Sequence, residues 1–143
     1  MQKTKELKSL ILHILEVRSM ANKLRVSKRT QQIFSKVGAT NSLPPFALAK
    51  LAIALSVRKG PLQEKDYGTD NEGQELNRQT IFGDHDLIFK CLIMMNAGEA
   101  LTEDEYFPKT VKAHLDRGAQ LLENEDRYTK NLCLSLCNLD KTI

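Results

Sequence analysis

A nearly uninterrupted apolar stretch lies in the first half of the chain, between two proline-containing breaks. It reads PPFALAKLAIALSV over residues 44–57, and Lys50 is its only charge before Arg58. Pro44 and Pro45 suit a first helical turn, where a missing N–H removes no hydrogen bond. A helix over about 44–58 that is apolar nearly all round must be buried nearly all round. In a chain of 143 residues, a self-association interface or a deep core helix meets this need, and we expect self-association.

The residues before this helix predict a short strand followed by another helix. Polar and apolar residues alternate over 23–27, as in a strand, and Ser27 or a neighbour can cap the helix that follows. Apolar positions in that helix, Ile33, Phe34 and Val37, fall on one face. We expect Gly38 to end it, because glycine enters the left-handed conformation without strain.

The second half of the chain is expected to be a polar loop followed by more helices. A cap at Asp84 precedes LIFKCLIMM, which closes at Gly98. Further helical signals are the capping-box pair Thr102 and Glu105, the apolar stripe Val111, Leu115, Gly118 and Leu122, and a last segment over about 127–139. The sequence therefore predicts a mainly α fold, a compact helical domain with a short N-terminal β-strand and a ribbon-helix-helix-like start. We divide it into an amphipathic helical extension over 1–19, with helix 4–18, and one helical domain over 20–143.

Charge is divided unevenly along the chain. Residues 1–59 carry twelve lysines and arginines against two acids, and residues 60–143 carry nine against sixteen, balances of +10 and −7. A basic N-terminal half is the electrostatic pattern expected of a protein that binds a polyanion.

No pattern of residues indicates catalysis. The three histidines are scattered, no nucleophile motif or glycine-rich phosphate loop is present, and Cys133 and Cys137 are expected in the core rather than at a metal. We therefore predict a protein that is not an enzyme and needs no cofactor or metal. Three cysteines without a signal peptide, and no long apolar run, predict a cytoplasmic location away from membranes.

The stretch Gly38-Ala39-Thr40-Asn41 is a candidate phosphate-binding site. A helix N-terminus after a small-residue turn presents free N–H groups to an anion. We expect residues 38–41 to supply backbone donors, while nearby cations add salt-sensitive attraction. The candidate DNA-binding residues are Lys23, Arg25, Lys28, Arg29, Lys36, Gly38, Ala39, Thr40 and Asn41.

From Met20 to about Leu122 the sequence resembles the DndE family of bacterial DNA sulfur-modification proteins. The matching stretches are KLRVSKRTQQIF, KVGATNSLPPFALAKLAIALSV, GQELNRQTIFGDHD and KAHLDRGAQLL, in that order. The resemblance implies a small, mostly helical homo-oligomer, a tetramer, that binds nicked or intact duplex DNA with a preference for nicked duplex, beside separate sulfur-transfer and ATPase subunits. The family's glycine-containing turn falls on Gly38 to Asn41, where Asn41 replaces a frequent second glycine.

Two other functions use the same residues differently. In a ribbon-helix-helix repressor, strands paired between two chains enter the major groove, so that Lys23, Arg25 and Ser27 face the bases. In an assembly adaptor, the basic half docks on an acidic partner protein. A repressor keeps its own operator against unrelated DNA, a backbone binder is displaced, and an adaptor binds no DNA.

Overall fold

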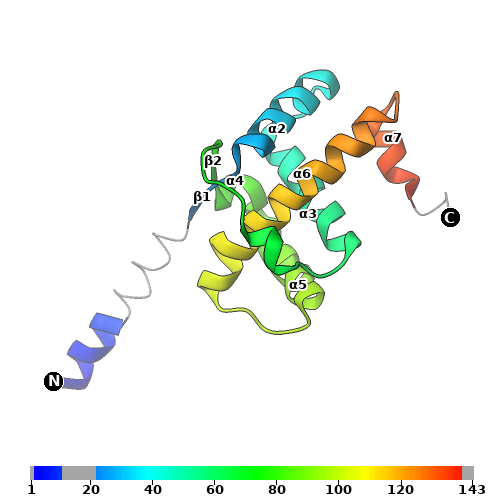
Figure 1. Cartoon of the computed structure of the whole chain (residues 1–143). Helices are drawn as coiled ribbons and strands as arrows, with labels where there is room; N and C mark the ends of the chain where they lie inside the picture. The colour runs from blue at the N-terminus through cyan, green and yellow to red at the C-terminus, as the bar shows by residue number, and fades with distance from the viewer. Residues whose placement is uncertain (1, 11–21, 140–143) are drawn as a thin grey trace.

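A computed structural model describes residues 2–10 and 22–139 of the chain (Figure 1). Residues 2–10 are helical, which agrees with the start of the helix predicted over 4–18; the remainder of that helix and the expected boundary at residues 19–20 lie outside the described residues. The helices and strands that follow are β1 (Lys23–Arg25), α2 (Lys28–Asn41), α3 (Pro45–Lys59), β2 (Glu75–Asn77), α4 (Arg78–Phe82), α5 (Asp86–Ala97), α6 (Val111–Arg127) and α7 (Leu132–Cys137). Two 3-10 segments, η1 (Glu64–Tyr67) and η2 (Gly83–His85), and an irregular helical segment, η3 (Glu105–Thr110), join them.

The strand predicted over 23–27 forms over residues 23–25 as β1, and its partner is β2 of the same chain. The two strands pair antiparallel, with Leu24 opposite Leu76 and Arg25 opposite Glu75. Both leucines are buried, whereas the residues on either side of them are exposed. Sequence reasoning placed residues 75–77 in a polar loop. In a ribbon-helix-helix protein the partner strand would come from a second chain.

The centre of the fold is the packing of α3 against α6. Figure 1 shows α6 running diagonally through the molecule beside α2 and α3, and it contacts both helices. A Cβ at Gly118 of α6 would overlap the backbone of Ala52 in α3, so the two helices touch without a side chain between them. This confirms the close approach predicted for Gly118. Because Leu48, Ala49 and Ile53 are also buried within the chain, α3 is a core helix.

Arg117 ties the end of α3 to α6. Its guanidinium donates to the carbonyl oxygens of Ser56 (2.5 Å), Gly60 (2.5 Å) and Pro61 (3.0 Å), which satisfies carbonyl groups at the helix terminus. Its Nε donates to the Ser56 hydroxyl at 2.8 Å. That hydroxyl lies 2.7 Å from Nδ1 of the buried His114. Arg117, Ser56 and His114 thus form a chain of polar contacts inside an otherwise apolar interface.

The structure confirms the predicted capping box and contradicts the predicted burial of two cysteines. The capping box forms, since Glu105 accepts from the Thr102 N–H at 2.9 Å and Thr102 accepts from the Glu105 N–H at 3.2 Å. The prediction that Cys133 and Cys137 lie in the core is wrong, because both are exposed; Cys91 is exposed as well. Within the described residues, no helix has the length and apolar character to span a membrane.

Candidate nucleic-acid interface

The two cations of β1 point outward on one face of the small sheet. Lys23 and Arg25 are exposed on either side of the buried Leu24. Arg25 is held in place, because its Nη1 donates to the Gly73 carbonyl at 3.2 Å and Glu75 lies opposite it on β2. β1 therefore presents one exposed lysine and one arginine that already has a protein partner.

The N-terminus of α2 is already occupied by the chain's own carboxylates. Ser27 caps the helix, as predicted, and accepts from the Thr30 N–H at 3.1 Å. The Ser27 N–H donates to Asp116 at 3.0 Å, and the Lys28 N–H donates to Asp70 at 2.9 Å. That backbone N–H from Lys28 lowers the pKa of the Asp70 carboxyl, and the Glu72 N–H adds to the effect. The terminus thus holds anions supplied by the protein.

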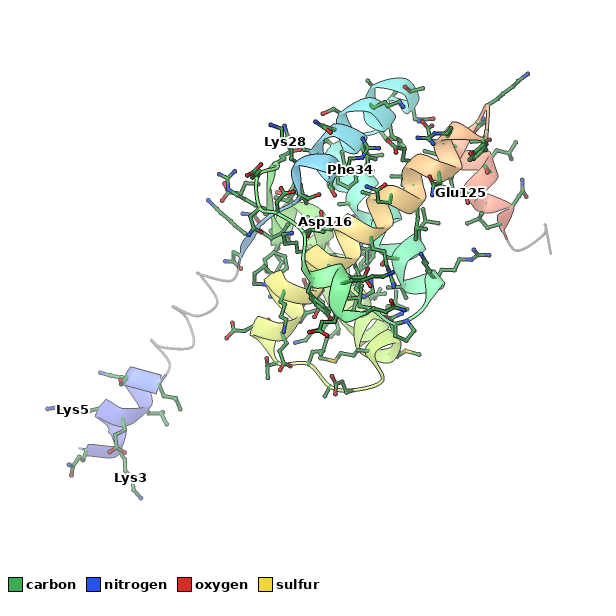
Figure 2. The ribbon with its side chains drawn as sticks, in the orientation of Figure 1. Lys3, Lys5, Lys28, Phe34, Asp116 and Glu125 are labelled. Atoms are coloured by element: carbon green, nitrogen blue, oxygen red, sulfur yellow. The ribbon has the colours of Figure 1, made fainter. Side chains whose placement is uncertain are left out.

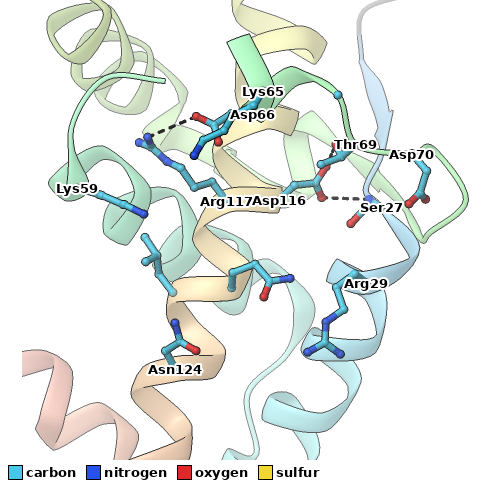
Figure 3. A pocket seen from close by; sticks show the side chains of 13 residues that line it. Ser27, Arg29, Lys59, Lys65, Asp66, Thr69, Asp70, Asp116, Arg117 and Asn124 are labelled. Atoms are coloured by element: carbon cyan, nitrogen blue, oxygen red, sulfur yellow. Dashed lines mark hydrogen bonds and ion pairs between the residues drawn. The ribbon is translucent and has the colours of Figure 1, made fainter. Parts of the chain in front are cut away.

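Asp116 joins three parts of the chain at this point. Although it is almost fully buried, it accepts from the hydroxyls of Thr30 (2.6 Å) and Thr69 (2.5 Å) and pairs with Lys112 at 2.7 Å. Figure 3 shows it extending from α6 toward Thr69 and Ser27. Sequence reasoning missed this residue, whose only signal is a carboxylate next to the apolar stripe.

Arg29 and Lys36 lie on exposed positions of α2 but differ in their surroundings. Arg29 is half-exposed and pairs at 2.6 Å with the buried carboxylate of Glu123, which Arg127 also approaches at 3.5 Å. Lys28 and Lys36 are exposed, and Figure 2 shows Lys28 directed away from the rest of the protein. The lysines of α2 therefore reach solvent, whereas Arg29 is partly neutralised.

The stretch 38–41 is helical, so the prediction that Gly38 ends α2 and begins a turn of free N–H donors is wrong. It forms the last turn of the helix, which ends at Ser42 with a left-handed φ of 56°. A helix C-terminus presents carbonyl groups and partial negative charge, the opposite of a phosphate-binding site. Here the side chains of Thr40 and Asn41 donate back to the Lys36 and Val37 carbonyls, at 3.0 and 2.9 Å.

Gly38 has a different role, close packing. A Cβ there would lie 2.9 Å from the Leu43 carbonyl oxygen and 3.0 Å from a methyl group of Leu48. The small residue thus lets the connection to α3 pass close to α2. Asn41 also donates to Asp126 of α6 at 2.8 Å, which anchors this end, while Ala39 remains exposed.

A groove of about 610 Å³ lies beside α2, between α6 and the segment around η1 (Figure 3). Four cations line it, Arg29, Lys59, Lys65 and Arg117. Two of its acids already have cationic partners, since Asp116 pairs with Lys112 and Asp66 lies 3.7 Å from Arg117. Lys59 and Lys65 are exposed and extend the cationic surface of α2 across the groove.

Comparison with known proteins identifies the family of this chain. The DndE family model, described as DNA sulphur modification protein DndE, matches residues 23–130. The chain belongs to the DndE family. A search of curated proteins finds no match.

Two solved DndE structures share this fold. DndE from Escherichia coli B7A, described as involved in DNA phosphorothioation modification, has a TM-score of 0.58 at 22% identity, covering 71% of this chain and 95% of that one. A DndE mutant with glycines replaced by lysine, described as involved in DNA phosphorothioation, has a TM-score of 0.57 at 20% identity, covering 70% and 95%. Likeness at this identity shows that the DndE fold is present in this chain.

Proposed function

We propose that this DndE-family protein is a non-enzymatic, DNA-binding accessory subunit of the DNA phosphorothioation machinery. It binds the sugar-phosphate backbone of duplex DNA and binds nicked duplex more tightly than intact duplex. Membership of a family of DNA sulphur modification proteins supports the biological process. The solved DndE structures with this fold are described as involved in DNA phosphorothioation, which agrees with it.

The observation that carries the DNA-binding proposal is the exposed face of α2. The helix reads KRTQQIFSKVGATN and contains no acidic residue. Lys28, Gln32 and Lys36 are exposed and recur every four residues, so they share one side of the helix. Lysine ammonium and glutamine amide groups donate hydrogen bonds, and phosphate oxygens accept them. Binding through these side chains replaces the backbone site expected at residues 38–41.

Arg29, Lys59 and Lys65 form the second part of the proposed surface. Lys59 and Lys65 line the groove and are exposed, so they can follow a phosphate strand that leaves α2. Arg29 must exchange Glu123 for a phosphate, and this exchange reduces its net contribution. Lys28 and Lys36 are therefore expected to contribute more to affinity than Arg29 does.

The remaining assignments concern assembly. We propose that the protein acts in the cytoplasm as a homo-oligomer, a tetramer, together with sulfur-transfer and ATPase subunits. Several copies bring several α2 faces to one duplex, and linked sites bind more tightly than single sites through effective concentration. A nick adds flexibility to the duplex, so the DNA can follow these faces at lower deformation cost.

The test is a salt titration with a charge-matched control. Lys28→Gln/Lys36→Gln and the control Lys109→Gln/Lys130→Gln each remove two exposed lysines, the second pair from other elements. Fluorescence anisotropy with labelled nicked, intact and single-stranded DNA of one sequence gives log Kd against log salt concentration. The α2 double variant should lose roughly 1.8 units of slope, at about 0.9 per phosphate contact, while the control keeps the wild-type slope.

Other outcomes separate the alternatives. Equal slopes for both double variants would remove α2 from the interface. Binding that survives excess unrelated DNA would favour an operator-specific repressor, and an absence of DNA binding would favour an adaptor. Equal affinity for nicked and intact duplex would remove the preference for nicks.

A further inference from the structure

The groove beside α2 has a neutral floor and cationic rims. The floor is the part of α6 formed by Gln120, Leu121 and Asn124, of which the two amide residues are exposed. The rims carry Lys59 at the end of α3 and Arg29 on α2, and Figure 3 shows these two residues on opposite sides of α6. Phosphates bind chiefly through cations, so a floor without charge suits a ligand that also has an uncharged polar part.

The amide groups of Gln120 and Asn124 have no hydrogen-bond partner among the described residues. The two residues are four apart on α6, so both side chains lie on the same face of the helix. Each amide offers a donor and an acceptor, as the edge of a nucleobase does, whereas a phosphodiester offers acceptors only. Leu121 is partly buried against the core and gives an apolar contact for the face of a base. The floor therefore matches an unpaired base, whose edge and face are both accessible.

We propose that the groove binds one unpaired nucleotide, with its base on the floor and its phosphate at Lys59 and Lys65. The inference rests on the proposed function, because these two lysines belong to the proposed DNA surface, and it adds a base-contacting part to that surface. At about 610 Å³ the groove falls within the ~300–1,000 Å³ range of small-ligand sites. A base inside duplex DNA is stacked and paired, so only an unpaired nucleotide can place its base there. The nucleotide is either free or part of a DNA strand, and both offer the same chemistry.

The charges around the groove place the phosphate at one end of it. Asp70 lines the end beside α2, and its exposed carboxylate repels a phosphate there. Figure 3 shows Asp70 on the far side of α6 from Lys59. Lys59 and Lys65 are exposed and form no ion pair with another described residue. Arg29, in contrast, already pairs with Glu123. The two lysines are therefore the phosphate end of the site.

Titration with free nucleotides tests the site without DNA. Each deoxynucleoside monophosphate, and inorganic phosphate for comparison, is added to isotope-labelled protein, and NMR gives the Kd and the residues whose signals shift. A nucleotide should bind about tenfold more tightly than inorganic phosphate, because its base adds hydrogen bonds and apolar contact. The side-chain amide signals of Gln120 and Asn124 should shift with nucleotide and stay in place with inorganic phosphate.

A double variant that changes no charge separates the base contact from electrostatic attraction. Gln120→Ala/Asn124→Ala removes both floor amides, and the control Gln74→Ala/Gln79→Ala removes two exposed amides outside the groove. The floor variant should bind nucleotide and inorganic phosphate equally, whereas the control should keep the wild-type difference. Both variants should keep the wild-type salt dependence of binding to intact duplex, because neither loses a cation.

A DNA comparison distinguishes the two sources of the nucleotide. Fluorescence anisotropy compares a nicked duplex with the same duplex carrying one unpaired nucleotide at the nick. Tighter binding of the second duplex, lost in Gln120→Ala/Asn124→Ala, assigns the site to a DNA strand. Equal binding of the two duplexes, together with binding of the free nucleotide, assigns it to a free nucleotide.

The remaining outcomes overturn the inference. If wild type binds inorganic phosphate as tightly as nucleotide, the floor contributes nothing. If the floor amides respond neither to free nucleotide nor to the unpaired nucleotide at the nick, the groove is not a nucleotide site. The salt slope of Lys28→Gln/Lys36→Gln decides the proposed function separately, because neither of these lysines lines the groove.

Discussion

Acidification should destabilise the fold through one buried imidazole, His114. Burial, assisted by the nearby positive charge of Arg117, lowers the pKa of His114 from 6.5 to about 4. The Arg117 Nε–H donates to the Ser56 hydroxyl, so that hydroxyl gives its own hydrogen to Nδ1 of His114. The neutral ring therefore carries its proton on Nε2, which is buried and has no hydrogen-bond partner among the described residues.

The magnitude follows from the difference in proton binding. In the unfolded chain His114 takes up a proton as the pH falls through 6.5, whereas the folded protein resists protonation until about pH 4. Full stability is therefore present above pH 6.5 and is lost as the pH falls toward 4. At 1.36 kcal/mol per pKa unit, the total loss is about 3 kcal/mol. Carboxylates with lowered pKa, Asp70 and Glu103, contribute a separate loss below about pH 4.5, because carboxyl groups of the unfolded chain protonate there.

Urea unfolding at intervals between pH 7.5 and 4.5 measures the effect. The free energy of unfolding should fall with a slope approaching 1.4 kcal/mol per pH unit over the lower part of this range. In His114→Gln the slope should vanish, and in the control His85→Gln, which alters an exposed histidine, it should remain. If His114→Gln does not fold, NMR of the wild-type imidazoles gives the same information. A folded-state titration of His114 near pH 6.5, or a stability that does not change over this range, would refute the reasoning.

Two further predictions concern the packing around α6 and use thermal or urea unfolding as the readout. Gly118→Ala should lower the free energy of unfolding by at least the ~1–3 kcal/mol typical of overpacked cores, because its Cβ meets the Ala52 backbone. The control Gly68→Ala should leave stability unchanged, because the atom nearest to its Cβ is 3.5 Å away. Equal effects of the two substitutions would contradict the helix contact. Asp116→Asn should lower the free energy of unfolding by about 3–5 kcal/mol, since it leaves Lys112 without its ionic partner in a mostly buried position. Asp104→Asn, at an exposed aspartate, is the control. If Asp116→Asn leaves stability unchanged, the contacts of Asp116 do not stabilise the fold.

Local sequence signals predicted the helices well and the short strands less well. Apolar spacing and capping residues placed α2, α3 and α6 because those signals act within a few residues along the chain. β2 was missed because its three residues are polar on both sides of Leu76, and only its pairing with β1 makes it a strand. The end of α2 was misplaced at Gly38 because the glycine serves tertiary packing against Leu48, which no local signal reports.

The candidate site was only partly predictable because charge along a sequence is not charge on a surface. The +10 and −7 halves suggested a basic face, but folding brings acids of the second half to residues of the first. Glu123 reaches Arg29, and Asp126 reaches Asn41. Lys23, the lysines of α2 and the cations of the adjoining groove remain at the surface, a set that depends on which acids lie nearby.

The anchoring of α2 by Asp116 also determines when that helix can be completed during synthesis. The carboxylate that binds its first turn lies 89 residues after Ser27 and 86 after Thr30. A chain emerging from the ribosome therefore exposes the lysines of α2 long before the residue that fixes their helix has been made. Helix α2, which we propose binds DNA, reaches its final form late, after most of the protein has been translated. A chain truncated before α6 would carry the same cations without their geometry.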